Sequence, residues 1–113
     1  MAVTTDASPK RKPYGVRQKT SRVKEASIEA YLRDRVQRTG GYCVKLPAGL
    51  YVGIPDRLVV LHDYIIFVEL KKPKGAQVEK VQKWWQWRLR EMGHHAEILR
   101  TKDEVDKLLR DFR

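Results

Sequence analysis

Two carboxylates and one ammonium group, those of Asp56, Glu69 and Lys71, have the residue types and the spacing for metal-assisted hydrolysis. Residues 57–61 and 64–71 are rich in β-branched and aromatic side chains, which predicts two consecutive strands. The side chains of Glu69 and Lys71 share one face of the second strand because they are two positions apart. The three polar groups therefore lie at one end of a predicted hairpin.

The register of this hairpin decides whether the two carboxylates meet. A two-residue turn at His62 and Asp63 places Asp56 directly opposite Glu69, with their Cβ atoms about 5 Å apart. A loop of odd length would turn one carboxylate to the other face of the sheet. Because His62-Asp63 is not a preferred two-residue turn sequence, this register is a hypothesis.

Two carboxylates at this place need a positive partner. The second strand is apolar on both faces, with Ile65 and Phe67 on the face of Glu69, which predicts a buried central strand. Neighbouring carboxylates repel, so one would be protonated unless a cation lies beside them. Mg²⁺ binds one or two carboxylates and keeps waters for a substrate phosphate, and Mn²⁺ accepts the same ligands. We therefore expect a divalent ion at Asp56 and Glu69, with Lys71 beside the attacking water or the phosphate.

Each of these features also has an ordinary structural explanation. An aspartate after a proline usually forms a turn, as Asp56 would after Pro55. Glutamate and lysine two positions apart on a strand are often a solvated surface pair, which would apply to Glu69 and Lys71. The apolar strand and the cross-strand pairing together favour the metal site.

The remaining elements follow from the spacing of apolar residues and from turn signals. They are a helix after residue 21 that Gly40-Gly41 terminates, a strand over 42–46, a helix over 76–92, a strand over 96–99 and a last helix that Thr101 and Glu104 begin. In the helix over 76–92, the residues expected to face the core are Val78, Val81, Trp85, Leu89 and Met92. The order α-β-β-β-α-β-α predicts an α/β fold with a mixed central sheet flanked by helices.

The charge of the chain is strongly positive and unevenly distributed. It has 113 residues, with 24 Lys+Arg against 14 Asp+Glu and a formal net charge of +10. Residues 1–20 are basic and poor in apolar side chains, which predicts a flexible arm, and residues 21–113 form one domain. The arm is either a clamp on a phosphate backbone or a solubilising tail. Nucleic acid is the favoured partner, and an anionic membrane surface is the weaker one.

The composition excludes several classes of protein and site. Cys43 is the only cysteine, which excludes an internal disulfide framework and a cysteine-rich zinc site. The longest apolar stretch, residues 64–68, is far shorter than a membrane span, and no N-terminal apolar segment suggests a signal peptide. No Gly-rich phosphate loop or dinucleotide motif indicates a small-molecule cofactor. We expect a cytoplasmic protein.

Two segments, Gly53-Ile54-Pro55-Asp56 and Val68-Glu69-Leu70-Lys71, resemble the motif of the PD-(D/E)XK nuclease superfamily when they stand on this order of elements. More narrowly, the chain resembles the VRR-NUC (virus-type replication–repair nuclease) family of the stand-alone viral or bacterial type, over about residues 25 to 100. Three further features fit that pattern, namely Glu29 in the first helix, Lys72-Pro73, and Gln82 followed by Trp85. The resemblance implies a restriction-endonuclease-like αβββαβ core with an additional C-terminal helix.

The resemblance also implies roles for individual residues. The expected catalytic residues are Asp56, Glu69, Lys71, Glu29 and Gln82. The expected ligands of Mg²⁺ or Mn²⁺ are Asp56, Glu69, the backbone carbonyl of Leu70, and Glu29. Glu29 borders the inward stripe of its helix, but Glu25 lies on the same face, so periodicity does not choose between them. The family pattern favours Glu29.

The function implied by the resemblance is that of a metal-dependent, structure-selective DNA endonuclease. The expected substrate is branched DNA, and a four-way (Holliday) junction resolvase acting as a homodimer in a bacterial or phage-infected cytoplasm is the first expectation. The alternatives are a monomeric flap or nicking nuclease and a non-catalytic basic DNA-binding module. The lysines expected to contact DNA are Lys45, Lys72, Lys74 and Lys83. Trp87 is expected to be exposed, at either a dimer contact or a stacking site for an unpaired base.

Overall fold

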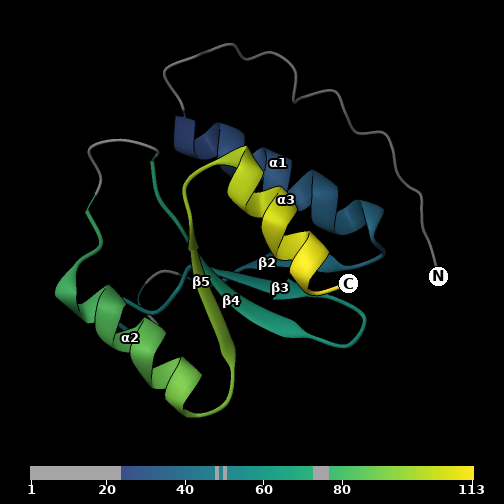
Figure 1. The fold of residues 1–113 in the computed structure, drawn as a ribbon. Helices are drawn as coiled ribbons and strands as arrows, with labels where there is room; N and C mark the ends of the chain where they lie inside the picture. The colour runs from purple at the N-terminus through teal and green to yellow at the C-terminus, as the bar shows by residue number, and fades with distance from the viewer. Residues whose placement is uncertain (1–23, 48, 50, 73–76) are drawn as a thin grey trace.

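The computed structural model describes residues 24–47, 49, 51–72 and 77–113, with the side chains of residues 24–26 outside the description. The predicted basic arm and Lys74 also lie outside the described residues. The elements follow the chain in the order α1 (Lys24–Arg38), β2 (Tyr42–Lys45), β3 (Arg57–Val60), β4 (Ile65–Leu70), α2 (Lys80–Glu91), β5 (His95–Leu99) and α3 (Lys102–Asp111) (Figure 1). Within the described ranges, no helix is long and apolar enough to cross a membrane.

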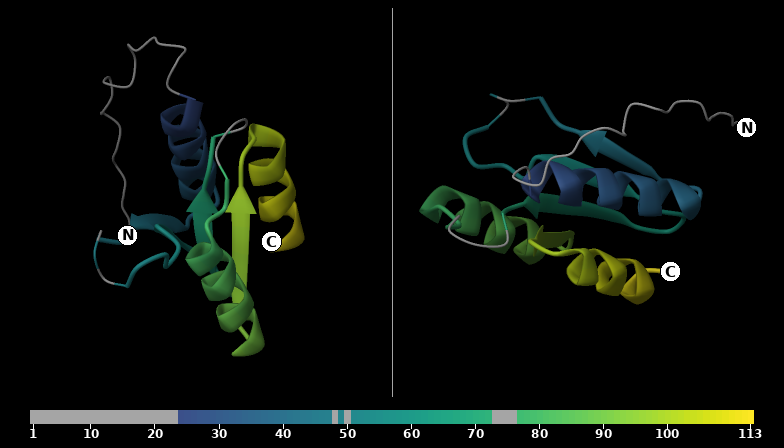
Figure 2. Two further views of the ribbon diagram at one scale, coloured as in Figure 1. Left: turned by 90° about the vertical axis from the view of Figure 1, so that its left-hand side faces the viewer. Right: turned by 90° about the horizontal axis from the view of Figure 1, so that it is seen from above.

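The strands form one mixed sheet in the order β2-β3-β4-β5. The pairs β2–β3 and β3–β4 are antiparallel, whereas β4 and β5 are parallel and are connected through α2. Figure 1 shows α1 and α3 together on one side of the sheet and α2 on the other, and Figure 2 gives the same arrangement from two further sides. The predicted α/β architecture with a mixed sheet and flanking helices is confirmed.

The hairpin between β3 and β4 has the predicted register over its whole ladder. At its closed end the amide of Leu61 donates a hydrogen bond to the carbonyl of Tyr64 over 2.8 Å, which leaves a turn of two residues. At its open end, one position beyond the ladder, the same register brings Asp56 level with Glu69. The local sequence therefore carries the two carboxylates to one end of the sheet.

The hydrophobic core lies between the sheet and the pair formed by α1 and α3. Its most completely buried side chains include Leu32, Val36, Val59, Ile66, Val68, Leu70 and Val105. Burying an aliphatic side chain of this size contributes about 1.5 to 3 kcal/mol. The periodic apolar residues of α1, Ile28, Leu32 and Val36, are buried, and the capping box of Thr101 and Glu104 begins α3 as predicted. The core thus fixes the sheet whose end carries the polar residues.

Helix α2 differs from the prediction in its start and in its buried face. It begins at Lys80 because Glu79 and Gln82 form a capping box there, not at residue 76. Val81 and Met92, which were expected to face the core, are exposed, and Gln86 is buried instead. The reason is that α2 packs mainly on β5, an edge strand, so it buries only a narrow stripe.

The face of β4 that carries Glu69 is also less covered than predicted. Strand β4 lies between β3 and β5, so its central position is confirmed. Ile65, at the start of the strand, is exposed, whereas Glu69, near the end, is only 7% exposed. Strand β4 is thus buried along the whole of the face that carries Ile66, Val68 and Leu70. Its other face, which carries Ile65, Phe67 and Glu69, is buried only near the end of the strand.

Candidate active site

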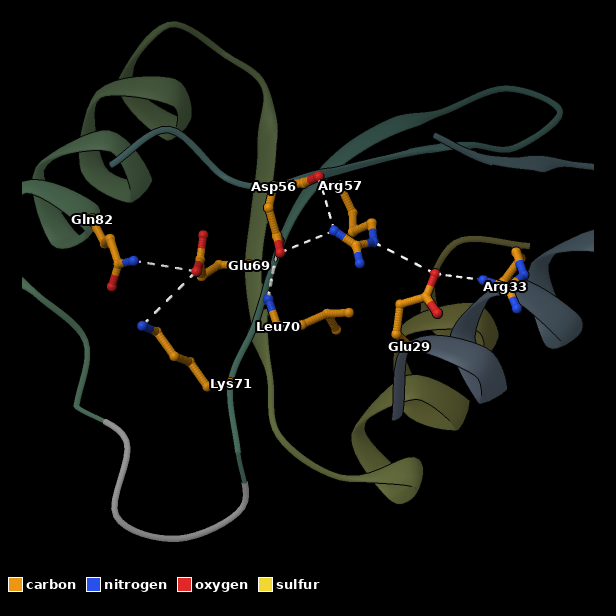
Figure 3. A network of polar contacts seen from close by, with 8 residues as sticks. All are labelled: Glu29, Arg33, Asp56, Arg57, Glu69, Leu70, Lys71 and Gln82. Carbon is orange, nitrogen blue, oxygen red and sulfur yellow. Dashed lines mark hydrogen bonds and ion pairs between the residues drawn. The ribbon is translucent and has the colours of Figure 1, made fainter. Parts of the chain in front are cut away.

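Asp56 is held by its backbone and by its carboxylate (Figure 3). Its carbonyl accepts a hydrogen bond from the amide of Leu46 at 2.9 Å, which extends the β2–β3 pairing by one residue. Its Oδ1 accepts from the amide of Leu70 at 3.3 Å, and its Oδ2 lies 3.0 Å from Nη1 of Arg57. The carboxylate therefore bridges the ends of two neighbouring strands.

Glu69 lies on the other side of this strand end, where it meets Lys71 and Gln82 (Figure 3). Its Oε2 accepts a hydrogen bond from Nε2 of Gln82 at 3.2 Å and lies 3.9 Å from Nζ of Lys71. The amide of Lys71 donates to the carbonyl of Leu99 on β5, which fixes the start of that side chain. Gln82 is oriented by the amide of Glu79, which donates to its Oε1. Glu69 is thus in contact with two other residues predicted from the sequence, Lys71 and Gln82.

Arg57 was missed by the sequence prediction, although it lies between two of the predicted residues. It is 8% exposed, and its guanidinium contacts the carboxylate of Asp56 and lies 3.8 Å from Oε2 of Glu29. The same Glu29 oxygen lies 2.6 Å from Nη1 of Arg33. The structure therefore links Glu29 to Asp56 through an arginine, not by direct contact (Figure 3).

The loop that leads to Asp56 is docked on α2. The indole nitrogen of Trp85 donates a hydrogen bond to the carbonyl of Val52 at 3.0 Å. Gly53 has φ +83°, and a Cβ added there would lie 2.5 Å from a methyl group of Val81. Only glycine combines this backbone conformation with so close an approach. The helix that supplies Gln82 thus also positions the loop that supplies Asp56.

The donor atoms of this site fit a hard divalent ion. The described residues contain no group of three or more His, Cys, Asp or Glu side chains arranged for a metal. They do offer the two carboxylates of Asp56 and Glu69 at one end of the sheet. Mg²⁺ in proteins commonly uses one or two carboxylates and retains waters, so this oxygen-only set suits it, and Mn²⁺ as well. The side chain of Asp56 is 35% exposed, which leaves access for water and a phosphate.

The lysines predicted to contact DNA have different positions. Lys45 ends β2 and is paired with Arg57, so it lies at the same end of the sheet as the carboxylates. Lys72 directly follows Lys71, and its carbonyl accepts a hydrogen bond from Arg100. Lys83 is exposed on α2, one residue after Gln82. Of these lysines, Lys45 lies at the carboxylate end of the sheet, whereas Lys72 and Lys83 are neighbours of Lys71 and Gln82 in the sequence.

Comparisons with known proteins, by sequence and by fold, both find nucleases or nuclease domains. No protein-family model matches the chain. The protein "Putative nuclease p44" of Acyrthosiphon pisum secondary endosymbiont phage 1 is 38% identical over 82 residues, which are 72% of this chain and 87% of that protein. A solved structure named "VRR_NUC domain" is 31% identical with a TM-score of 0.72, over 80% of this chain and 98% of that one. A second, named "VRR_NUC domain protein", is 17% identical with a TM-score of 0.66, over 80% and 88% of the two chains, and supports the fold alone.

Proposed function

The chain belongs to the VRR-NUC nuclease family, and from this premise we propose that it is a Mg²⁺- or Mn²⁺-dependent DNA endonuclease that selects its substrate by structure. The observation that carries the proposal is the position of Asp56, Glu69 and Lys71 at one end of the sheet, where Asp56 accepts from the amide of Leu70 and Glu69 pairs with Lys71. Simple DNA binding does not require two carboxylates there, because carboxylates repel phosphate. Metal-assisted hydrolysis of a phosphodiester uses such carboxylates to hold the ion.

Asp56, Glu69 and the carbonyl of Leu70 are the groups that would hold the ion. A bound divalent ion would supply an activated water and would neutralise charge on the phosphate. The ammonium of Lys71 can donate a hydrogen bond to the attacking water or to a phosphate oxygen, where it stabilises the negative charge that develops. Gln82 holds the carboxylate of Glu69 in place through its 3.2 Å hydrogen bond. The chain thus provides binding, orientation and charge stabilisation at one point.

Glu29 and Arg57 support this site from the opposite side of the sheet. The guanidinium of Arg57 is a fixed positive charge against Asp56 and Glu29. This charge reduces the repulsion between the carboxylates of Asp56 and Glu29, and it fixes the orientation of Asp56. In this arrangement Glu29 acts on the site through Arg57, and not as a direct ligand of the ion.

The proposed substrate is branched DNA, and the proposed active species is a homodimer. The formal charge of +10 favours a polyanionic partner, and Lys45, Lys72 and Lys83 offer phosphate contacts around the site. Resolving a four-way junction requires two symmetric cuts, which a two-fold dimer supplies with one site per subunit. The named phage relative supports the cytoplasm of a bacterial host as the place of action.

Cleavage of labelled four-way junction, flap and plain duplex DNA tests the proposal, each with Mg²⁺, Mn²⁺ or EDTA. We expect paired symmetric nicks in the junction with either metal and none in EDTA. Lys71→Ala should abolish the nicks, and Lys107→Ala, an exposed lysine on α3, should leave them unchanged. Cleavage of flaps or duplex alone would keep the active site and replace the resolvase by a monomeric nicking nuclease. Binding without any cleavage would identify a non-catalytic DNA-binding module.

A further inference from the structure

All three tryptophans of the chain lie on α2, and with Tyr51 they form a continuous aromatic strip. The ring of Tyr51 lies 5.5 Å from that of Trp85, Trp85 lies 5.2 Å from Trp84, and Trp84 lies 6.5 Å from Trp87, measured between ring centroids. Tyr51 is 66% exposed, Trp84 49% and Trp87 53%. Large adjacent aromatic surfaces in water usually mark a site of interaction. The proposed chemistry uses none of these rings.

The aromatic strip is carried by the same loop and the same helix as two residues of the candidate active site. Tyr51 belongs to the loop that ends at Asp56, and the hydrogen bond from Trp85 to Val52 joins that loop to α2. Gln82, which contacts Glu69, is one helical turn before Trp85 (Figure 3). A DNA strand with one phosphate at the carboxylates can therefore pass its neighbouring nucleotides along this strip.

The charges beside the aromatic strip suit a polyanion. The basic residues of α2 are Lys80, Lys83, Arg88 and Arg90, against Glu91 as the only acidic one. A groove beside Trp87 is lined by Lys83, Gln86, Trp87, Arg90, Glu91 and Ile98. Aromatic rings interleaved with cations are the usual means of binding single strands, because the rings stack on bases and the cations contact the backbone.

We infer that the aromatic strip binds unpaired bases of a single-stranded segment next to the phosphate that is cut. The inference rests on the proposed function, since it specifies the substrate of the same site. It also explains a preference for branched DNA, because paired bases in a duplex do not expose their faces to a protein ring. Stacking on rings depends little on base identity, so we expect selection of structure and not of sequence.

A second copy of this chain is a poorer occupant of the strip. A two-fold interface places the same patch of each subunit against itself. It would bring the four basic residues of one α2 close to the same four of its partner, with one glutamate on each side to compensate. Like charges across an interface disfavour association. The homodimer of the proposed resolvase would then form through another surface.

Intrinsic tryptophan fluorescence tests the inference, because every tryptophan of the chain belongs to the strip. The full chain is titrated in EDTA, so that no cleavage occurs, with three oligonucleotides of equal phosphate number. They are a single strand, a blunt-ended duplex, and a single strand whose central nucleotides are abasic. We expect quenching and tight binding with the first, and affinity weaker by about fivefold or more with the other two.

The variants Trp84→Ala and Trp87→Ala should each weaken binding of the single strand by about 5- to 100-fold. Trp85 is left intact because it also holds the loop of Asp56. Tyr42→Ala, which removes an exposed aromatic ring from β2, is the matched control and should bind as the wild type does. Equal affinity for natural and abasic strands, or unchanged binding in both tryptophan variants, would overturn the inference.

Two further outcomes separate this inference from the proposed function. Cleavage by the wild type together with unchanged binding in the tryptophan variants would retain the nuclease and reject the strip. Binding of unpaired bases in EDTA, without cleavage in any metal, would support base binding by the strip and would contradict the proposed nuclease activity. If Trp87→Ala loses self-association in sedimentation while its affinity for single strands is unchanged, the strip is a dimer contact and the inference is wrong.

Discussion

The guanidinium of Arg57 holds two acidic side chains of the site and is itself nearly buried. A buried guanidinium loses hydration, and its ion pairs with Asp56 and Glu29 offset that cost. Its Nη1 donates a hydrogen bond to Asp56 and fixes the direction of that carboxylate, whereas its Nε lies 3.8 Å from Glu29 without a hydrogen bond. Arg57 is therefore a positioning residue for Asp56.

Arg57→Met should lower the free energy of unfolding by about 1 to 3 kcal/mol, because two carboxylates lose a partly buried partner. The loss is smaller than for a fully buried pair, since both carboxylates retain some solvent. Urea unfolding measures it. Arg38→Met removes the exposed Arg38–Asp34 pair on α1 and should change stability by less than about 0.5 kcal/mol. Equal effects of the two substitutions would contradict a structural role for Arg57.

Glu29→Ala should reduce the rate of DNA cleavage by about 10- to 100-fold, as loss of a supporting group at a metal site commonly does. Glu25→Ala, at the position that helical periodicity left as an equal candidate, should have no such effect. The measurement is the cleavage rate under excess enzyme. Equal losses in the two variants, or no loss in Glu29→Ala, would refute the choice of Glu29.

At the residue scale, the sequence predicted the groups whose spacing follows from strand geometry. Asp56 and Glu69 were predicted to meet because the two-residue turn fixes their register, and the structure brings them to one strand end. Arg57 was not predicted, since an arginine at the start of a strand has no periodic partner in the sequence. The predicted register could have revealed it, because this register pairs Arg57 with Val68, whose side chain is buried in the core. A charged side chain on that face of the sheet needs an acidic partner.

At the scale of elements, the hairpin and the capped helix α3 followed from local rules, whereas the orientation of α2 did not. Helices α1 and α3 bury the apolar residues that their periodicity turns to one side, because both helices pack on the hydrophobic core. Helix α2 covers an edge strand, where Arg90 donates to the carbonyl of Ala96 and Gln86 is buried beside it. Polar contacts of this kind depend on tertiary placement, and apolar periodicity does not reveal them.

The thiol of Cys43 tests how β2 packs against the rest of the fold, because this side chain contacts the hydrophobic core. Burial is the main cause that raises the pKa of the Cys43 thiol above its ordinary value of 9.0, and nearby Glu29 adds to it. The folded protein therefore holds the proton more tightly than the unfolded chain. We expect this contribution to stability to be complete below pH 9 and to be lost as the pH rises further.

Alkylation of the single thiol measures the same effect directly. At pH 8 we expect iodoacetamide to react several-fold more slowly with the folded protein than with the protein in urea, because the thiolate is the nucleophile. The rate in the folded protein should rise with pH. Equal rates in the folded and unfolded protein would mean that β2 does not bury this side chain against the rest of the fold.

At the scale of the whole molecule, the positive charge predicts how binding depends on salt. Residues 1–20 contain five basic side chains, Lys10, Arg11, Lys12, Arg17 and Lys19. If they contact phosphates, deleting residues 1–20 should make the slope of log affinity against log salt shallower by about 1 to 4. Binding of junction DNA in EDTA at several salt concentrations measures this slope. An unchanged slope would mean that the arm is only a solubilising tail.

The most direct test of the central claim is the rate of phosphodiester cleavage in Mn²⁺ by Asp56→Asn and Glu69→Gln beside the wild type. Asp63→Asn, in the turn at the opposite end of the same hairpin, is the matched control for the loss of a carboxylate. We predict rates at least about 100-fold lower in the first two variants and an unchanged rate in the control, with all three folded by circular dichroism. Wild-type rates in either Asp56→Asn or Glu69→Gln would contradict the account, because the ion and the attacking water would then be held elsewhere.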